Sequence, residues 1–132
     1  MSLAVVDTDV ISMLFKSRPE ARFYESYLVA KEPAVSFMTI AELNLWPLVG
    51  RWGKRRIDKL NDFLADFAVL PCTDEVCIRW ADLSYEARSV GRPISCADAW
   101  IAATASIYGA ELLTHNVKDF AGLSSVDVVS AP

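Results

Sequence analysis

The sequence predicts an α/β domain with a central, mostly parallel β-sheet flanked by helices. Three observations predict it. Short apolar runs alternate with segments of helical periodicity, no linker, repeat or low-complexity tract interrupts them, and 53% of the 132 residues are apolar. A chain of this length buries about two-thirds of the surface that its unfolded form exposes. We therefore expect residues 1–132 to form one domain.

The N-terminal third predicts two strands and two helices. Leu3–Val6 is a short apolar strand that ends at the polar cluster Asp7-Thr8-Asp9, and a short helix follows over Val10–Phe15. Arg18-Pro19-Glu20 begins a second helix, because proline and an acid favour the first helical turn. Ala34–Phe37 is the second predicted strand.

The middle of the chain predicts two further helices and a strand. Thr39 opens a helix that Pro47 is expected to kink, since proline lacks the N–H of the helical ladder. Apolar residues at helical spacing over Leu60–Phe67 predict an amphipathic helix. Ala68–Leu70 is a brief strand before a proline.

The last third alternates helix and strand in the same way. Val76–Ala87 carries apolar residues at helical spacing, and Ser95–Tyr108 is an alanine-rich helix closed by a glycine. Glu111–Thr114 and Val126–Val129 are the last predicted strands.

Charge and cysteine content exclude several classes of protein. Seventeen acids against thirteen Lys and Arg give a net charge of −4, unlike a histone-type nucleic-acid binder or a basic membrane-surface protein. The sequence shows no secretory signal and no membrane-spanning stretch, so we expect a cytoplasmic protein. Three cysteines, Cys72, Cys77 and Cys96, argue against a disulfide framework, and we expect buried, inert thiols rather than a zinc site.

Four acids are predicted to lie at one edge of the sheet. Asp7 ends the first strand, Glu42 lies in a helix after the second, and Asp119 follows the strand that ends at Thr114. Asp98 lies in the first turn of the alanine-rich helix. Ligands of open parallel sheets bind outside the carboxyl ends of the strands. Gathered carboxylates repel one another, and a hard cation such as Mg²⁺ relieves that repulsion.

Helix capping is the alternative explanation for some of these acids. Thr39-x-x-Glu42 and Ser95-x-x-Asp98 each fit a capping box, in which the acid satisfies backbone N–H groups at a helix start. Asp9 is a natural N-cap, and Asp119 fits an ordinary turn. No capping box explains Asp7, which directly follows an apolar strand.

Four motifs, in order along the whole chain, carry a resemblance to a known family. They are Val6-Asp7-Thr8, Thr39-x-x-Glu42-Leu43, Ala97-Asp98-Ala99-x-Ile101-Ala102-Ala103 and Thr114-x-Asn116-x-x-Asp119-Phe120. Their order and spacing resemble a PIN domain. Among PIN domains, a short stand-alone chain resembles the VapC-type toxins of bacterial and archaeal toxin–antitoxin pairs.

The resemblance implies an endoribonuclease that depends on Mg²⁺ or Mn²⁺, with a cognate antitoxin as partner and a homodimer as its assembly. By motif match, the acids that bind the metal and carry catalysis are Asp7, Glu42, Asp98 and Asp119. Thr8 matches the hydroxyl residue beside the first acid, and Asn116 matches the polar residue that orders the last loop. Many relatives carry Asn or Ser where this chain has Asp9, which we therefore treat as a cap rather than a ligand.

The chemistry of the residues agrees with this role. A metal ion lowers the pKa of a bound water and stabilises charge on a phosphate, so no histidine or cysteine nucleophile is needed. The single histidine, His115, has no evident triad partner and is expected in a loop or partly buried, with a substrate contact as the alternative. The indole rings of Trp46, Trp52 and Trp100 are expected to pack in the core or a dimer interface, with base stacking as the alternative.

A basic cluster is the candidate surface for RNA phosphates or for an acidic antitoxin. It consists of Arg51, Lys54, Arg55, Arg56 and Lys59. The alternative is that these side chains form only the solvated face of a helix.

Two other functions remain open from the sequence. Asp7-Thr8-Asp9 after an apolar strand also resembles the first motif of haloacid-dehalogenase-type phosphatases, in which the first Asp is the nucleophile. The chain is short for that family. A non-catalytic module that binds a protein partner, with acids that only cap helices, is the third possibility.

Overall fold

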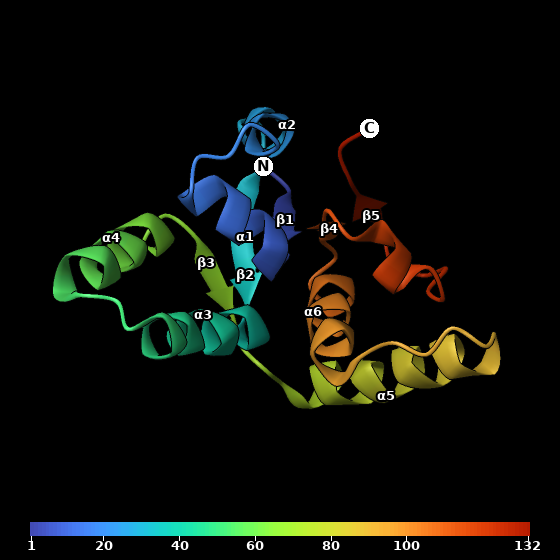
Figure 1. Cartoon of the computed structure of the whole chain (residues 1–132). Helices are drawn as coiled ribbons and strands as arrows, with labels where there is room; N and C mark the ends of the chain where they lie inside the picture. Colours follow the sequence, from blue (N-terminus) through green and yellow to red (C-terminus); the bar gives the residue numbers. More distant parts are fainter.

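The computed structural model describes residues 1–132 and contains a five-stranded sheet in the order β3-β2-β1-β4-β5. Every neighbouring pair of strands is parallel. The predicted fold class is therefore confirmed (Figure 1). The strands are β1 (Leu3–Val6), β2 (Glu32–Ser36), β3 (Ala68–Leu70), β4 (Glu111–Leu113) and β5 (Val128–Val129). The helices are α1 (Thr8–Phe15), α2 (Ala21–Leu28), α3 (Phe37–Gly50), α4 (Lys54–Leu64), α5 (Asp74–Ser89), α6 (Cys96–Ile107) and a 3₁₀ turn, η1 (Val117–Phe120).

The sheet has an apolar core on each face, because side chains alternate along its strands. Val5 points to the face covered by α5 and α6, and Val6 points to the face covered by α1 to α4. Leu112 and Leu113 of β4 divide between the two cores in the same way. This burial on both faces explains why the predicted strands are apolar throughout.

Helices α1, α3, α4 and α5 begin earlier than the sequence indicates, and the caps of α1 and α3 come from the residues at the ends of β1 and β2. Asp7 is the N-cap of α1, and its Oδ1 accepts the N–H of Thr8 at 2.8 Å. The predicted helix start at Val10, with Asp9 as the cap, is therefore wrong. Ser36 caps α3 and its Oγ accepts the N–H of Thr39 at 3.1 Å.

The α3–α4 region also differs in detail from the prediction. Helix α3 continues through Pro47 to Gly50, and Arg51 ends it in the left-handed conformation with φ of 52°. Helix α4 spans Lys54–Leu64, so the basic cluster forms its N-terminal half and the segment preceding it. No helix combines the length and apolarity that a membrane crossing requires.

The prediction of buried thiols is wrong. Cys72, Cys77 and Cys96 are all exposed and unbridged. Cys72 lies in the loop after β3, Cys77 in the first turns of α5, and Cys96 at the start of α6. Core positions at these helix ends are instead filled by neighbours such as Val76 and Ala99, because a helix turns only one stripe of residues toward the sheet.

Candidate active site

Asp7 lies at the carboxyl end of the central strand and is held on both sides. Its side chain is only 6% exposed. Besides capping α1 through Oδ1, it accepts a hydrogen bond at Oδ2 from the hydroxyl of Thr114, 2.7 Å away. Val6 of β1 pairs with Leu113 of β4, and the N–H of Asp7 donates to the Leu113 carbonyl at 2.9 Å. The pairing of two parallel strands thus brings Asp7 and Thr114 together.

The environment of Asp7 opposes its ionisation. Burial is the largest cause, and the negative charge of Asp9 is the next, so that the pKa of Asp7 rises from 3.8 to about 7. The hydrogen bonds from Thr114 and Thr8 act in the opposite direction, and the charge of Asp98 raises the pKa further. A nearby cation would favour the carboxylate that this environment disfavours.

Glu42 is bound to the start of α1 rather than to the start of its own helix. Its Oε1 accepts the hydroxyl hydrogen of Thr8 at 2.8 Å. The Thr8 hydroxyl also lies 3.0 Å from that of Thr39, which is fully buried. Because Ser36 caps α3, the capping-box explanation for Glu42 is wrong. Glu42 remains beside the site as a half-buried carboxylate.

Asp9 joins the site to the loop after β4. Its Oδ2 accepts the backbone N–H of His115 and the side-chain N–H of Asn116, both at 3.0 Å. Asn116 also donates its backbone N–H to the Thr114 hydroxyl at 3.2 Å. Sequence reasoning assigned Asp9 to a helix cap. Its Oδ1 accepts the N–H of Val10 at 2.7 Å in the first turn of α1, while its Oδ2 fixes the loop that leads to η1.

His115 lies in the loop, where the sequence placed it, and is exposed. Its Nδ1 is 2.8 Å from the hydroxyl of Tyr24, a fully buried residue of α2. The same hydroxyl accepts the N–H of Ala131 at 3.1 Å. Tyr24 therefore ties the loop after β4 to α2 and to the C-terminal segment, and sequence reasoning did not find it.

Asp98 and Asp119 belong to the same polar hollow. Both line it, together with Ser95, Arg92 and Lys118. The Ser95 Oγ accepts the N–H of Asp98 at 3.1 Å, so the capping contact predicted for this helix is present. Burial is the largest cause that raises the pKa of Asp98, and the charges of Asp119, Glu42 and Asp9 add to it.

These electrostatic effects place the predicted acids in one neighbourhood. The charges of Asp9 and Asp98 act on Asp7, and those of Asp119, Glu42 and Asp9 act on Asp98. Figure 1 shows α3 and α6 on either side of the sheet end to which β2 points. None of the five acids forms a salt bridge, because the two ion pairs of the chain are Lys31–Glu111 and Lys54–Asp58. Arg92 and Lys118 lie in the lining of the hollow beside Asp98 and Asp119, but neither forms a salt bridge with an acid of the group.

The donor set fits a hard cation that keeps much of its water. No three His, Cys, Asp or Glu side chains approach closely enough to enclose an ion by themselves. Mg²⁺ needs only one or two carboxylates and keeps several waters, whereas zinc and calcium sites require more protein ligands. Asp7 and Asp98, the two acids whose ionisation is opposed by burial and by like charge, fit that requirement best.

The basic residues line a second hollow at the far end of α1. Phe15, Lys16, Arg55, Arg56 and Lys59 surround it together with Gly53. The guanidinium of Arg56 lies 3.9 Å from the ring centre of Trp52, which stacks on Phe15. Lys54 lies beside the hollow and is paired with Asp58 at 2.8 Å, and Arg51 ends α3. Lys16, which the sequence analysis did not include, belongs to this basic pocket.

The tryptophans pack against other side chains, as expected. Trp46 and Trp52 are tilted neighbours with ring centres 6.3 Å apart, and Trp100 stacks on Trp80 at 5.2 Å. All are half-buried.

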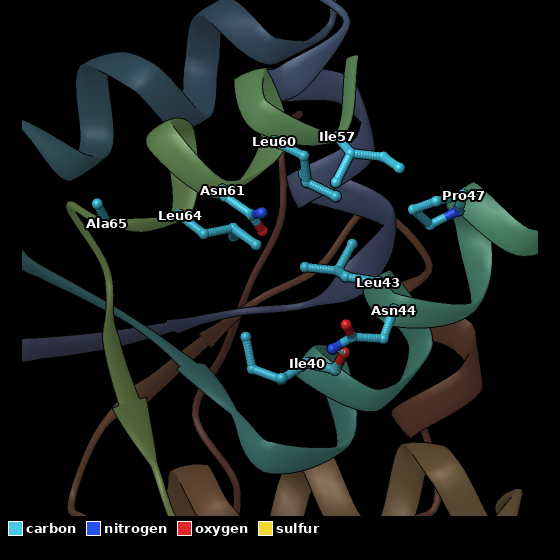
Figure 2. A pocket seen from close by; sticks show the side chains of 9 residues that line it. All are labelled: Ile40, Leu43, Asn44, Pro47, Ile57, Leu60, Asn61, Leu64 and Ala65. Carbon is cyan, nitrogen blue, oxygen red and sulfur yellow. Dashed lines mark hydrogen bonds between the residues drawn. The ribbon is translucent and has the colours of Figure 1, made fainter. Parts of the chain in front are cut away.

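An apolar groove between α3 and α4 is separate from the acids. Figure 2 shows side chains of both helices pointing into it, among them Leu43 from α3 and Leu60 from α4. Its polar lining consists of Asn44 and Asn61, which carry no charge. The groove therefore has no group for acid–base or metal chemistry.

Comparison with known proteins gives the family. The profile of the PIN domain family matches residues 4–124. The chain belongs to the PIN domain family. Ribonuclease VapC1 of Haemophilus influenzae strain R2866 is 31% identical over 122 residues, which cover 88% of each chain. Ribonuclease VapC5 of Mycobacterium tuberculosis is 29% identical over 130 residues, covering 95% of this chain and 93% of the relative.

Solved structures of related chains have the same fold. A chain in the structure of VapBC-1 from nontypeable Haemophilus influenzae superposes with a TM-score of 0.83 at 26% identity, over 97% of both chains. A chain of VapBC-5 from Mycobacterium tuberculosis, a member of the VapBC family of toxin–antitoxin systems, superposes with a TM-score of 0.76 at 26% identity, over 99% of this chain and all of that one.

Proposed function

We propose that this PIN domain protein is the toxin of a toxin–antitoxin pair, an endoribonuclease that depends on Mg²⁺ or Mn²⁺. The observation that carries the proposal is the group of carboxylates at the carboxyl edge of the sheet, none of which forms a salt bridge. The curated relatives, which are named VapC ribonucleases, support it.

Asp7 and Asp98 would hold the metal ion, with Glu42 and Asp119 acting directly or through water. When bound, such an ion lowers the pKa of a water molecule and stabilises charge on the phosphate. Other residues of the chain orient these carboxylates. Thr114 and the N–H of Thr8 fix the two oxygens of Asp7, and the Thr8 hydroxyl fixes Glu42. Asp9 and Asn116 fix the loop before Asp119.

The basic pocket would bind the RNA backbone away from the bond that is cleaved. Helix α1 has eight residues between the acid end and the pocket end, a length of about 12 Å. Of the cationic side chains that line the pocket, Lys16, Arg55, Arg56 and Lys59, none forms a salt bridge. Unpaired cations fit phosphates, and their local positive charge offsets the net charge of −4.

We further infer a cognate antitoxin as protein partner, a homodimer as the assembly, and a cytoplasmic location. The solved VapBC-1 and VapBC-5 structures support the antitoxin partner. Three exposed thiols without a disulfide are consistent with a reducing compartment. Light scattering of the purified protein at several concentrations tests the dimer, which predicts twice the chain mass.

The comparisons disfavour the two alternatives, because the PIN domain profile matches residues 4–124 and the curated relatives are named ribonucleases. For a non-catalytic module, acids should serve only as caps. Glu42 and Asp9 instead bind side chains and loops from other parts of the chain.

RNA cleavage by the purified protein tests the proposal. We expect cleavage of single-stranded or structured RNA with Mg²⁺ or Mn²⁺, and none with EDTA. Asp7→Asn and Asp98→Asn should each reduce the rate at least about a hundredfold while circular dichroism stays unchanged. The control is Asp82→Asn, which changes an exposed acid of α5 outside the site. Full activity in both site variants would refute the metal site, and an acyl-phosphate on Asp7 would favour the phosphatase.

RNA binding tests the basic pocket separately. In an Asp98→Asn background, Arg55→Ala and Lys59→Ala should each weaken binding and lower the slope of log affinity against log salt by about one. Arg88→Ala, an exposed cation on α5, is the matched control. Equal slopes in all variants would exclude the pocket from phosphate binding.

A further inference from the structure

Two exposed cysteines of the chain lie side by side, and neither belongs to the acid cluster. The Sγ atoms of Cys72 and Cys77 are 3.6 Å apart, and both side chains are exposed. The third thiol, Cys96, takes no part in this contact. It belongs to the first turn of α6, where its backbone carbonyl accepts the indole N–H of Trp80 at 3.2 Å.

The backbone on each side of the pair is ordered by hydrogen bonds. Thr73 is the N-cap of α5, with its Oγ1 accepting the N–H of Val76 at 3.2 Å and its carbonyl accepting the N–H of Cys77 at 3.0 Å. On the other side, the carbonyl of Pro71 accepts the hydroxyl of Tyr108 at 3.4 Å. The cap and the strand end together hold the two thiols at a fixed spacing.

The surroundings favour thiol chemistry over metal binding. No third cysteine, histidine or carboxylate completes a metal site with this pair. Zinc needs four ligands in a structural site, so two thiols do not suffice. The sulfur of a disulfide lies about 2.0 Å from its partner, so the two sulfurs must approach by about 1.6 Å to form the bond.

We propose that Cys72 and Cys77 are a redox-reactive pair that closes to an intrachain disulfide by exchange with a small disulfide such as oxidised glutathione. One cysteine thiolate attacks a glutathione sulfur, which forms a mixed disulfide and releases glutathione thiolate. The second cysteine thiolate then attacks the protein sulfur and releases the other glutathione. Two electrons and two protons leave the protein, and the oxidant becomes two glutathione thiols.

The environment of Cys72 affects its reactivity. Desolvation raises the pKa of the Cys72 thiol, and its hydrogen bond to Cys77 raises it further. Since the thiolate is the nucleophile, the raised pKa slows attack by Cys72. Both steps use groups already in contact.

Mass spectrometry of the folded, full-length chain tests the proposal. In a Cys96→Ser variant, equilibration with oxidised glutathione should give a chain two hydrogens lighter that retains no glutathione and no alkylatable thiol. Adding Cys72→Ser or Cys77→Ser to that variant should leave a single, stable glutathione adduct. Retained glutathione in the Cys96→Ser variant, a disulfide-linked dimer, or two free thiols would each overturn the proposal.

The wild-type chain provides a second measurement that needs no substitution. Trypsin cuts after Lys59 and Arg79, so Cys72 and Cys77 fall in one peptide and Cys96 in another. The oxidised protein should yield the first peptide lighter by two hydrogens. The exchange constant should also be at least about tenfold larger in the folded chain than in urea, because folding holds the thiols together. An equal or smaller constant in the folded chain would overturn the proposed role of the fold.

Discussion

Asp7→Asn should stabilise the metal-free protein at alkaline pH. The pKa of Asp7 is 3.8 in an ordinary environment and about 7 in the fold, chiefly through burial. Between about pH 4 and pH 7 the folded chain therefore keeps a proton that the unfolded chain has released. Stability falls with pH wherever the folded state binds more protons, so the buried carboxylate lowers stability as pH rises through this window.

The size of the pKa shift of Asp7 determines how much folding stability is lost. About three pKa units correspond to about 4 kcal/mol of lost stability above pH 7, as an upper bound. About 2.5 kcal/mol of this falls between pH 5 and pH 8. Asparagine keeps the cap of α1, since its amide oxygen accepts the Thr8 N–H, and it carries no charge to bury. The variant should therefore lose this pH dependence.

Urea unfolding in EDTA at pH 5 and pH 8 measures the difference. With a slope of about 2 kcal/mol/M, the midpoint of the parent should fall by about 1 M relative to that of the variant. The raised pKa of Asp98 lowers stability with rising pH in both proteins, so the comparison isolates the contribution of Asp7. Asp82→Asn should follow the parent. A variant less stable than the parent at pH 8, or a difference that does not change with pH, would refute the electrostatic explanation.

Three further substitutions test other contacts of the fold and site. Thr114→Val removes the hydroxyl that donates to Asp7 and raises the pKa of that carboxyl. The acidic limb of the pH profile of kcat/KM should move to higher pH. An unchanged limb would show that the ionisation of Asp7 does not control activity. Tyr24→Phe deletes a buried hydroxyl bonded to His115 and Ala131, and urea unfolding should show a loss of about 1–3 kcal/mol. Gly122→Ala puts a Cβ 2.8 Å from a backbone carbonyl oxygen and should lower Tm through a loss of about 1–3 kcal/mol; an unchanged Tm would contradict this packing.

The sequence by itself determined the fold class and the edge at which the acids lie. Strand and helix periodicities are local, so Leu3–Val6 and Ser95–Tyr108 could be recognised without knowledge of their neighbours. Because all the strands proved parallel, the acid that follows β1 and the loop that follows β4 had to meet at one edge. The four acids could therefore be named as one group from their order along the chain.

Only the tertiary structure decided what each acid contacts. Glu42 binds Thr8 across 34 residues, and Asp9 binds Asn116 across 107, so neither contact leaves a local signal. Both acids matched capping patterns, and their actual partners depend on which strands are neighbours. The raised pKa of Asp7 likewise depends on burial by residues far away in sequence.

The cysteines likewise show that burial cannot be predicted from the sequence alone. A thiol is most often buried, and composition alone favoured that environment for Cys72 and Cys77. The cap at Thr73 instead begins α5 so that both side chains face water and touch each other. Local pattern determines which elements form. The packing of those elements decides which side chains meet and which are withdrawn from solvent, because burial is a property of the whole chain.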